Sequence, residues 1–206
     1  MADLPLIELL FRTLSDHYPE RSPTAAYLYA QTSDNQGSVL DRAALLSQLE
    51  ELWIAESPPR NGYPGFDKWC SELEGRGVSA SRIVPVPTAE HAILNTRTEA
   101  ESVVKLARER RTKALYVIAS PLHQLRAFMT LISVALESAP TLRLYSLPGN
   151  SLDWQEHAVH SQGTVSGTRS ALVAGELERI VRYQQKGDLA PLAAVLSYLN
   201  QRDTKE

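Results

Sequence analysis

Short apolar runs alternate with longer segments of helical periodicity along most of this chain, and no other feature constrains its fold as strongly. Residues 25–30 and 114–119 are continuous apolar runs, as expected of strands that are buried on both faces. Shorter runs at 52–55, 83–86 and 142–145 predict further strands. Because strands and helices in regular alternation imply right-handed crossovers, the sequence predicts an α/β fold whose mostly parallel sheet is covered by helices on both sides.

Helices are predicted between these strands and towards both ends of the chain. The helical segments are residues 4–15, 39–51, 66–74, 96–111 and 122–137. From Ser166 onward the pattern is helical with a break at Gly187 and Asp188, which predicts a pair of C-terminal helices packed on the core. Residues 150–167 have no regular pattern and are expected to form a loop or lid. The predicted organisation is therefore an N-terminal helix, an α/β domain, and an appended loop with two helices, over residues 1–24, 25–149 and 150–206.

Charge and cysteine content exclude several classes of protein. With 21 basic and 24 acidic residues among 206, the net charge is −3, so no general attraction to nucleic acid or anionic lipid is expected. The single cysteine, Cys70, excludes an internal disulfide framework and a cysteine-based zinc finger. No apolar stretch approaches the roughly 18 residues of a membrane-spanning helix, and the N-terminus lacks the layout of a secretory signal. We therefore expect a cytoplasmic protein.

Polar residues gather where the predicted strands end. Ligands of open parallel sheets bind outside the carboxyl ends of the strands, so the loops that follow them are the candidate site. These loops are residues 31–38, 57–65, 87–96, 120–126 and 146–151. No glycine-rich dinucleotide fingerprint, phosphate-binding P-loop, nucleophile elbow or zinc-protease motif is present. The chemistry of these loops therefore has to be inferred from individual residues.

The segment from Asn95 to Glu99 has two compatible interpretations. In one, Thr96 is the N-cap of the following helix and Glu99 reaches back to its backbone N–H in a capping box. In the other, the same helix start presents free N–H groups and a positive dipole end to a phosphate or carboxylate.

The segment Ser120-Pro-Leu-His123-Gln-Leu-Arg126 directly follows the clearest strand. His123 and Arg126 are three residues apart and therefore share one helical face, where they could bind an anion together or let the histidine donate a proton. The alternative is that His123 caps or packs at the surface and that Arg126 pairs with a nearby carboxylate.

Two further segments carry weaker signals. Asn61 lies in a turn-rich loop that could close over a ligand, with Arg60 supplying charge and Tyr63 an aromatic surface. His157 and His160 lie close to two acidic residues, but without rigid spacing they are more typical of a surface than of a metal site, and no metal is predicted.

The order and spacing of several short motifs resemble the YdcF-like (SanA-like) domain-of-unknown-function family over roughly residues 25–149. The motifs are Asn95-Thr96 with Glu99, Ser120-x-x-His123-x-x-Arg126, Arg42 before an alanine and leucine run, and Gly77-Val78 before Arg82-Ile83. The resemblance implies a Rossmann-like α/β/α sandwich with one pocket at the strand ends. It also implies a site made of Arg42, Asn95, Thr96, Glu99, His123 and Arg126.

The leading hypothesis is that the protein binds a small anionic metabolite, nucleotide-like or phosphate-bearing. Arg42 and Arg126 would hold the negative charge, the helix starts at Thr96 and Leu122 would donate N–H groups, and His123 would transfer any proton. Asn61, Asn95 and Ser120 complete the predicted ligand-binding set. On this hypothesis Arg126→Ala should lower ligand affinity sharply and leave folding intact.

Three alternatives remain open at this point. A hydrolase or transferase of a phosphate or glycosyl substrate would use His123 as acid and Glu99 as base. An S-adenosylmethionine-binding protein would use the loop after the first strand, whose only glycine is Gly37. An interaction module would dock through the apolar stripe of the C-terminal helices. The sequence identifies no cofactor and no oligomeric state.

Overall fold

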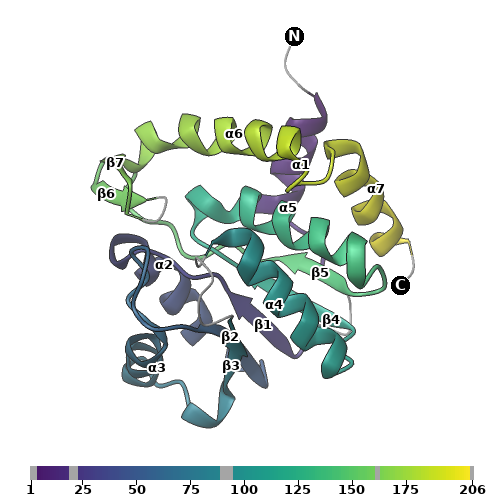
Figure 1. The fold of residues 1–206 in the computed structure, drawn as a ribbon. Coiled ribbons are helices and arrows are strands. Elements are labelled where there is room, and N and C mark those ends of the chain that lie inside the picture. The colour runs from purple at the N-terminus through teal and green to yellow at the C-terminus, as the bar shows by residue number, and fades with distance from the viewer. Residues whose placement is uncertain (1–3, 19–22, 89–94, 161–162, 205–206) are drawn as a thin grey trace.

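The protein is built around a five-stranded parallel sheet. The computed structural model describes residues 4–18, 23–88, 95–160 and 163–204. The strands are β1 (Ala25–Leu28), β2 (Glu51–Glu56), β3 (Ile83–Pro87), β4 (Ala114–Ile118) and β5 (Arg143–Ser146). Their order across the sheet is β3-β2-β1-β4-β5, with every neighbouring pair parallel (Figure 1). The predicted sheet is confirmed, and β3, which contains Pro85, lies at its edge as prolines require.

Helices cover both faces of the sheet, which makes the fold a Rossmann-like three-layer sandwich (Figure 1). One face carries α2 (Ser33–Ala44) and α3 (Phe66–Gly75), and the other carries α4 (Thr96–Glu109) and α5 (Pro121–Ser138). Successive side chains of a strand point to opposite faces, so β1 contributes to two separate cores. Tyr27 packs in the core under α4 and α5, whereas Ala26 and Leu28 pack in the core under α2 and α3.

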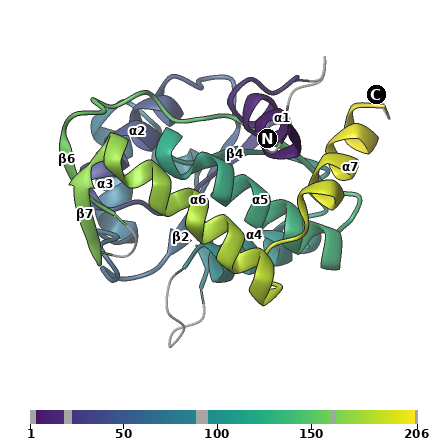
Figure 2. The same cartoon turned by 90° about the horizontal axis from the view of Figure 1, so that it is seen from above.

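Helix α5 is enclosed by the rest of the molecule. Residues 122–135 are all buried, as expected of a helix that is apolar around most of its circumference. Its outer side is covered by α1 (Leu4–Leu14), α6 (Arg169–Lys186) and α7 (Leu192–Asp203), as Figure 2 shows from above. Leu189, Val195 and Leu199 from the predicted C-terminal stripe are buried in this contact. The stripe therefore packs on the core and does not form a docking surface.

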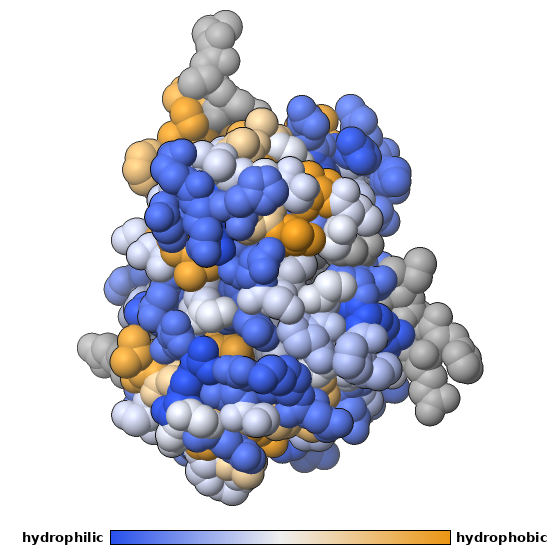
Figure 3. All heavy atoms as spheres, turned by 90° about the vertical axis from the view of Figure 1, so that its left-hand side faces the viewer, coloured by the Kyte–Doolittle hydropathy of each residue, from blue (hydrophilic) through white to orange (hydrophobic). Residues whose placement is uncertain are grey.

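Exposed apolar side chains are found on α1, where Leu4 and Phe11 are 73% and 70% exposed, and on α6, where Val173, Leu177 and Val181 are exposed. Figure 3 shows orange atoms near the top of the molecule and in smaller patches elsewhere on a face that is mostly hydrophilic. No helix in the described part of the chain is both long and apolar enough to cross a membrane.

The segment 150–167 differs from its prediction, because it contains a β-hairpin. Strands β6 (His157–His160) and β7 (Val165–Thr168) pair antiparallel, and α6 begins at Arg169, after the hairpin. Each strand has only four residues, and in β6 the buried positions are Ala158 and His160. Strands this short, with a histidine facing inward, lack the apolar alternation by which a strand is recognised in a sequence.

Helix α2 was also misplaced by the sequence pattern, which predicts a loop at 31–38 and a helix at 39–51. The helix instead runs from Ser33 to Ala44 and includes Gly37. Its first turns are polar because they lie near the carboxyl ends of the strands, and apolar residues enter the core only from Val39 onward. Residues 45–50 form turns that lead into β2.

Candidate functional site

A cavity of about 520 Å³ opens at the carboxyl ends of the strands. It lies beside β1 and β4, where the strand order reverses, which is the usual ligand site of open parallel sheets. Its walls come from the β1–α2 turn, the β2–α3 loop, the starts of α4 and α5, strand β6 and helix α6. Six of the predicted site residues line it: Asn61, Asn95, Thr96, Glu99, His123 and Arg126.

Arg42 and Ser120 do not line this cavity. Arg42 lies in the last turn of α2, ten residues after Thr32, which does line the cavity. Ten helical residues span about 15 Å, so Arg42 lies too far along the helix to line the cavity. The resemblance assigned Arg42 to the site; it would lie in the first turn of the predicted helix 39–51, but α2 begins at Ser33. Ser120 is the buried N-cap of α5 and donates from Oγ to Gln31 Oε1 at 2.9 Å.

Asn95, and not Thr96, is the N-cap of α4. Its Oδ1 accepts from Arg97 N at 2.9 Å and from Thr98 N at 3.0 Å, and Thr98 Oγ1 accepts from Asn95 N. The capping box is therefore formed with Thr98, which corrects the predicted role of Glu99. Since the backbone N–H groups of Arg97 and Thr98 are used by the cap, they are not free to bind an anion.

Glu99 points into the fold instead of capping its helix. Its Oε2 accepts from Tyr27 Oη at 2.7 Å and from Ala30 N at 2.9 Å. Burial raises the pKa of Glu99 to about 7, although these two hydrogen bonds and the charge of Arg126 oppose the rise. Oε1 makes no hydrogen bond with the described residues, and the residue lines the cavity. Glu99 can therefore exchange a proton near neutral pH.

His123 is buried between Gln31 and Thr96. Gln31 Nε2 lies 3.1 Å from His123 Nδ1, and Thr96 Oγ1 lies 3.2 Å from His123 Nε2. Burial and the nearby charge of Arg126 hold the pKa of His123 well below its ordinary value. The imidazole is therefore neutral at physiological pH.

Arg126 is held by a carboxylate from α6, as one of its two sequence interpretations predicts. Its Nε donates to Glu176 Oε2 at 2.7 Å and its Nη1 donates to Thr96 Oγ1 at 2.7 Å. Glu176 Oε1 also accepts from Arg179 Nη1 at 2.7 Å and lies 2.8 Å from His160 Nε2. Burial acts to raise the pKa of Glu176, but the charge of Arg126 and the hydrogen bond with His160 outweigh it and hold the pKa well below its ordinary value.

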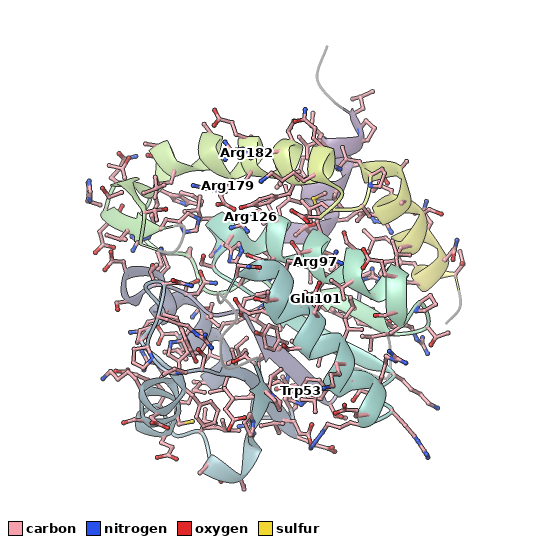
Figure 4. All side chains as sticks on the ribbon, viewed as in Figure 1. Trp53, Arg97, Glu101, Arg126, Arg179 and Arg182 are labelled. Carbon is pink, nitrogen blue, oxygen red and sulfur yellow. The ribbon has the colours of Figure 1, made fainter. Side chains whose placement is uncertain are left out.

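Figure 4 shows Arg126, Arg179 and Arg97 grouped where α4, α5 and α6 approach one another. Sequence reasoning missed Glu176 and Arg179 because both lie on a helix that the chain reaches 50 residues after Arg126. It also missed Arg97, which lines the cavity and pairs with the more exposed Glu101 and Glu137.

The three residues predicted in the β2–α3 loop, Arg60, Asn61 and Tyr63, all line the cavity. The ring of Tyr63 packs edge-on against Trp69, with centroids 5.2 Å apart, and its hydroxyl donates to Ala55 O. The aromatic residue that α6 presents to the cavity is Tyr183, whose ring centroid lies 6.0 Å from the guanidinium of Arg126.

The two histidines of β6 do not converge. His157 is exposed and His160 is buried, because they lie on opposite faces of the strand. Within the described ranges, no group of three or more histidine, cysteine or acidic side chains is arranged to hold a metal ion.

No model of a known protein family matches the chain, and no curated protein matches it in sequence. The function therefore has to be argued from the geometry of the cavity. That geometry offers guanidinium and hydroxyl donors around a buried carboxyl group that titrates near neutral pH.

Proposed function

We propose that the protein is a cytoplasmic, YdcF-like protein that binds a small anionic metabolite, nucleotide-like or phosphate-bearing, in the cavity beside β1 and β4. The supporting observation is an excess of positive charge around Glu176. Among the residues that line the cavity, the basic side chains are Arg60, Arg97 and Arg126, and the acidic ones are Glu99, Glu101 and Asp188. Glu176 is shared by Arg126 and Arg179, so one carboxylate faces two guanidinium groups. All three side chains are largely buried, with exposed fractions of 6%, 8% and 13%.

A buried charge without a counter-charge is costly, so a site of this kind favours an anion. Glu99 supplies only part of a counter-charge at neutral pH, because its pKa is about 7. Arg126 lines the cavity, and a guanidinium binds phosphate or carboxylate with two charge-assisted hydrogen bonds. The cavity of about 520 Å³ falls within the range of roughly 300–1,000 Å³ that is typical of small-molecule sites.

The enzymatic alternative receives less support from the geometry. His123 was the predicted acid, but its lowered pKa leaves it neutral, and its Nε2 faces Thr96. The S-adenosylmethionine alternative depended on the loop after β1, but α2 begins at Ser33 and includes Gly37.

Calorimetric titration with inorganic phosphate and with nucleoside monophosphates tests the proposal. Arg97→Gln removes a cavity cation whose partners, Glu101 and Glu137, are both more than half exposed, so folding should be preserved. Arg126→Lys keeps the positive charge next to Glu176 but loses the planar guanidinium group, which can donate two parallel hydrogen bonds to one anion. Each change should weaken binding about tenfold, since a hydrogen bond to a charged group contributes roughly 1.5–3 kcal/mol.

Arg108→Gln is the matched control, because it removes the same charge from the last turn of α4. It should bind like the wild type. Arg126→Ala is unsuitable, contrary to the sequence-based expectation, since breaking its buried pair with Glu176 should destabilise the fold by about 3–5 kcal/mol. Equal affinities in all variants, or no binding of any phosphate-bearing compound by the wild type, would contradict the proposal.

A further inference from the structure

A chain of hydrogen bonds leads from the base of α5 to the cavity. Ser120 Oγ donates to Gln31 Oε1 at 2.9 Å, Gln31 Nε2 meets His123 Nδ1 at 3.1 Å, and His123 Nε2 meets Thr96 Oγ1 at 3.2 Å. Ser120, Gln31 and His123 are all buried, so bulk water does not compete for these groups. The direction in which each proton is donated decides what Thr96 can offer to a ligand.

The backbone sets the orientation of the Gln31 amide. Gln31 Nε2 also donates to the carbonyl oxygen of Tyr29 at 3.2 Å, and a carbonyl oxygen can only accept. The reversed amide would place Oε1 against that carbonyl oxygen and leave two acceptors facing each other. Gln31 therefore presents an N–H group to His123.

That N–H group in turn sets the tautomer of His123. Nδ1 has to accept from Gln31, so it carries a lone pair, and the single proton of the neutral ring lies on Nε2. The ring then donates from Nε2 to Thr96 Oγ1. The lowered pKa of His123 agrees with this arrangement, since a charged imidazole would turn a second donor towards Gln31.

Thr96 Oγ1 consequently accepts two hydrogen bonds, one from His123 Nε2 and one from Arg126 Nη1 at 2.7 Å. A hydroxyl oxygen has two acceptor positions and one proton to donate, so both acceptor positions are filled. The Thr96 hydroxyl makes no other hydrogen bond with the described residues, and Thr96 lines the cavity. The hydroxyl proton is therefore the one hydrogen-bonding group that the Thr96 side chain has left to offer.

We propose that Thr96 is a specificity-determining hydrogen-bond donor, and that Gln31 is a positioning residue that holds it in this role through His123. The site then selects a ligand with an unprotonated acceptor oxygen, as in phosphate or a carboxylate, at this point. It rejects an ammonium or N–H group there, because two donors would face each other. This inference rests on the proposed anion-binding function and states which chemical group of the ligand Thr96 recognises.

The first test needs no ligand. Long-range ¹H–¹⁵N spectra of the labelled protein report the tautomer of each histidine, and a His123→Asn sample assigns the resonances of His123. The wild type should show the Nε2–H tautomer. Gln31→Glu places a carboxylate beside Nδ1 and should bring a proton to that nitrogen, a signature that simple loss of packing would not produce. An Nδ1–H tautomer in the wild type would overturn the assignment.

The second test measures affinity for inorganic phosphate, acetate and methylammonium by calorimetry. Thr96→Val keeps the shape of the side chain without its hydroxyl and should weaken anion binding about tenfold, whereas Thr96→Ser should stay within about twofold of the wild type. Methylammonium should not bind to the wild type, to Thr96→Val or to Thr96→Ser. Equal anion affinity in the wild type and Thr96→Val, or binding of methylammonium in the cavity, would contradict the role of Thr96.

The two proposals fail in different ways. If the wild type binds neither anion while His123 has the expected tautomer, the anion-binding function is wrong although the hydrogen-bond chain is correct. If an anion binds and its affinity depends on Arg97 but not on the Thr96 hydroxyl, the function stands and the inference about Thr96 is wrong. Thermal unfolding of each variant confirms that the comparison is made between folded proteins.

Discussion

Glu99 is a buried carboxyl group whose protonation should be linked to stability. Its pKa is raised from 4.5 to about 7 in the folded protein, mainly by burial. Between these two values the folded state holds a proton that the unfolded chain has released. The stability contributed by the neutral carboxyl is therefore present at low pH and is lost as the pH rises towards 7.

Glu99→Gln should remove this pH dependence, because an amide oxygen can still accept from Tyr27 and Ala30. Relative to the wild type, its free energy of unfolding should rise by up to about 3 kcal/mol between roughly pH 5 and pH 8, at about 1.4 kcal/mol for each unit of pKa shift. Urea unfolding across this range measures the difference. Glu101→Gln is the control, because it removes an exposed carboxylate from the same helix and should show the pH dependence of the wild type. If the free energy of unfolding of Glu99→Gln changes with pH as that of the wild type does, the raised pKa of Glu99 is contradicted.

Sequence reasoning was most successful for residues whose neighbours along the chain define their place. His123 and Arg126 were assigned to the site because they follow a buried strand at helical spacing, and both line the cavity. The cap of α4 was misassigned by one residue, since Asn95 and Thr96 are both good N-caps and the chain direction alone does not distinguish them. The partner of Glu99 could not be predicted, because Tyr27 lies 72 residues away.

The β6–β7 hairpin is held beside the cavity by hydrogen bonds to the start of α2. Its backbone meets the start of α2, where Thr32 Oγ1 donates to Val159 O at 2.7 Å and Asp34 Oδ2 accepts from Val159 N at 2.7 Å. Arg169, the first residue of α6 directly after the hairpin, is buried and donates to Asn35 Oδ1 and to the backbone oxygen of Asp34. These contacts allow His160 to reach Glu176 and complete the wall of the cavity.

Arg169→Gln should loosen the hairpin without unfolding the sheet. The variant loses charge-assisted hydrogen bonds to Asn35 and Asp34, each of which contributes roughly 1.5–3 kcal/mol. Amide hydrogen exchange in β6 and β7 should become at least about tenfold faster, while exchange in β1 and β4 should stay unchanged. Arg182→Gln, an exposed change on the same helix, serves as the control. Unchanged exchange in the hairpin would show that Arg169 does not anchor it.

On the scale of the whole molecule, the two ends of the described chain meet on β5. Arg202, in α7, donates to both carboxylate oxygens of Asp16 at 2.6 and 2.8 Å and to Leu144 O at 2.6 Å. Asp16 Oδ2 also accepts from Ser146 N at 2.7 Å. Both side chains are almost completely buried, so this ion pair joins α7 to the segment after α1 at the edge of the sheet. Tyr198 of α7 and Thr13 of α1 make further hydrogen bonds to β5 and the residues beside it.

Arg202→Met should destabilise the protein by about 3–5 kcal/mol, because it leaves the carboxylate of Asp16 buried without a cation. The double variant Asp16→Asn, Arg202→Met should recover part of this loss, since no uncompensated charge then remains. Urea unfolding of both single variants and the double variant measures the coupling. Strictly additive effects would mean that the pair does not act as a unit.

Local periodicity was enough to predict the parallel sheet and its covering helices, and the cavity lies at the carboxyl ends of the predicted strands. Such patterns are read from residues that are neighbours in the chain, and burial on one or both faces imposes them directly. The folded chain alone decided which polar groups meet: Glu176 with Arg126 across 50 residues, and Gln31 with His123 across 92. Hydrogen bonds and ion pairs form only between groups that lie within a few ångströms of each other. The number of residues between two groups in different elements does not indicate whether they are that close.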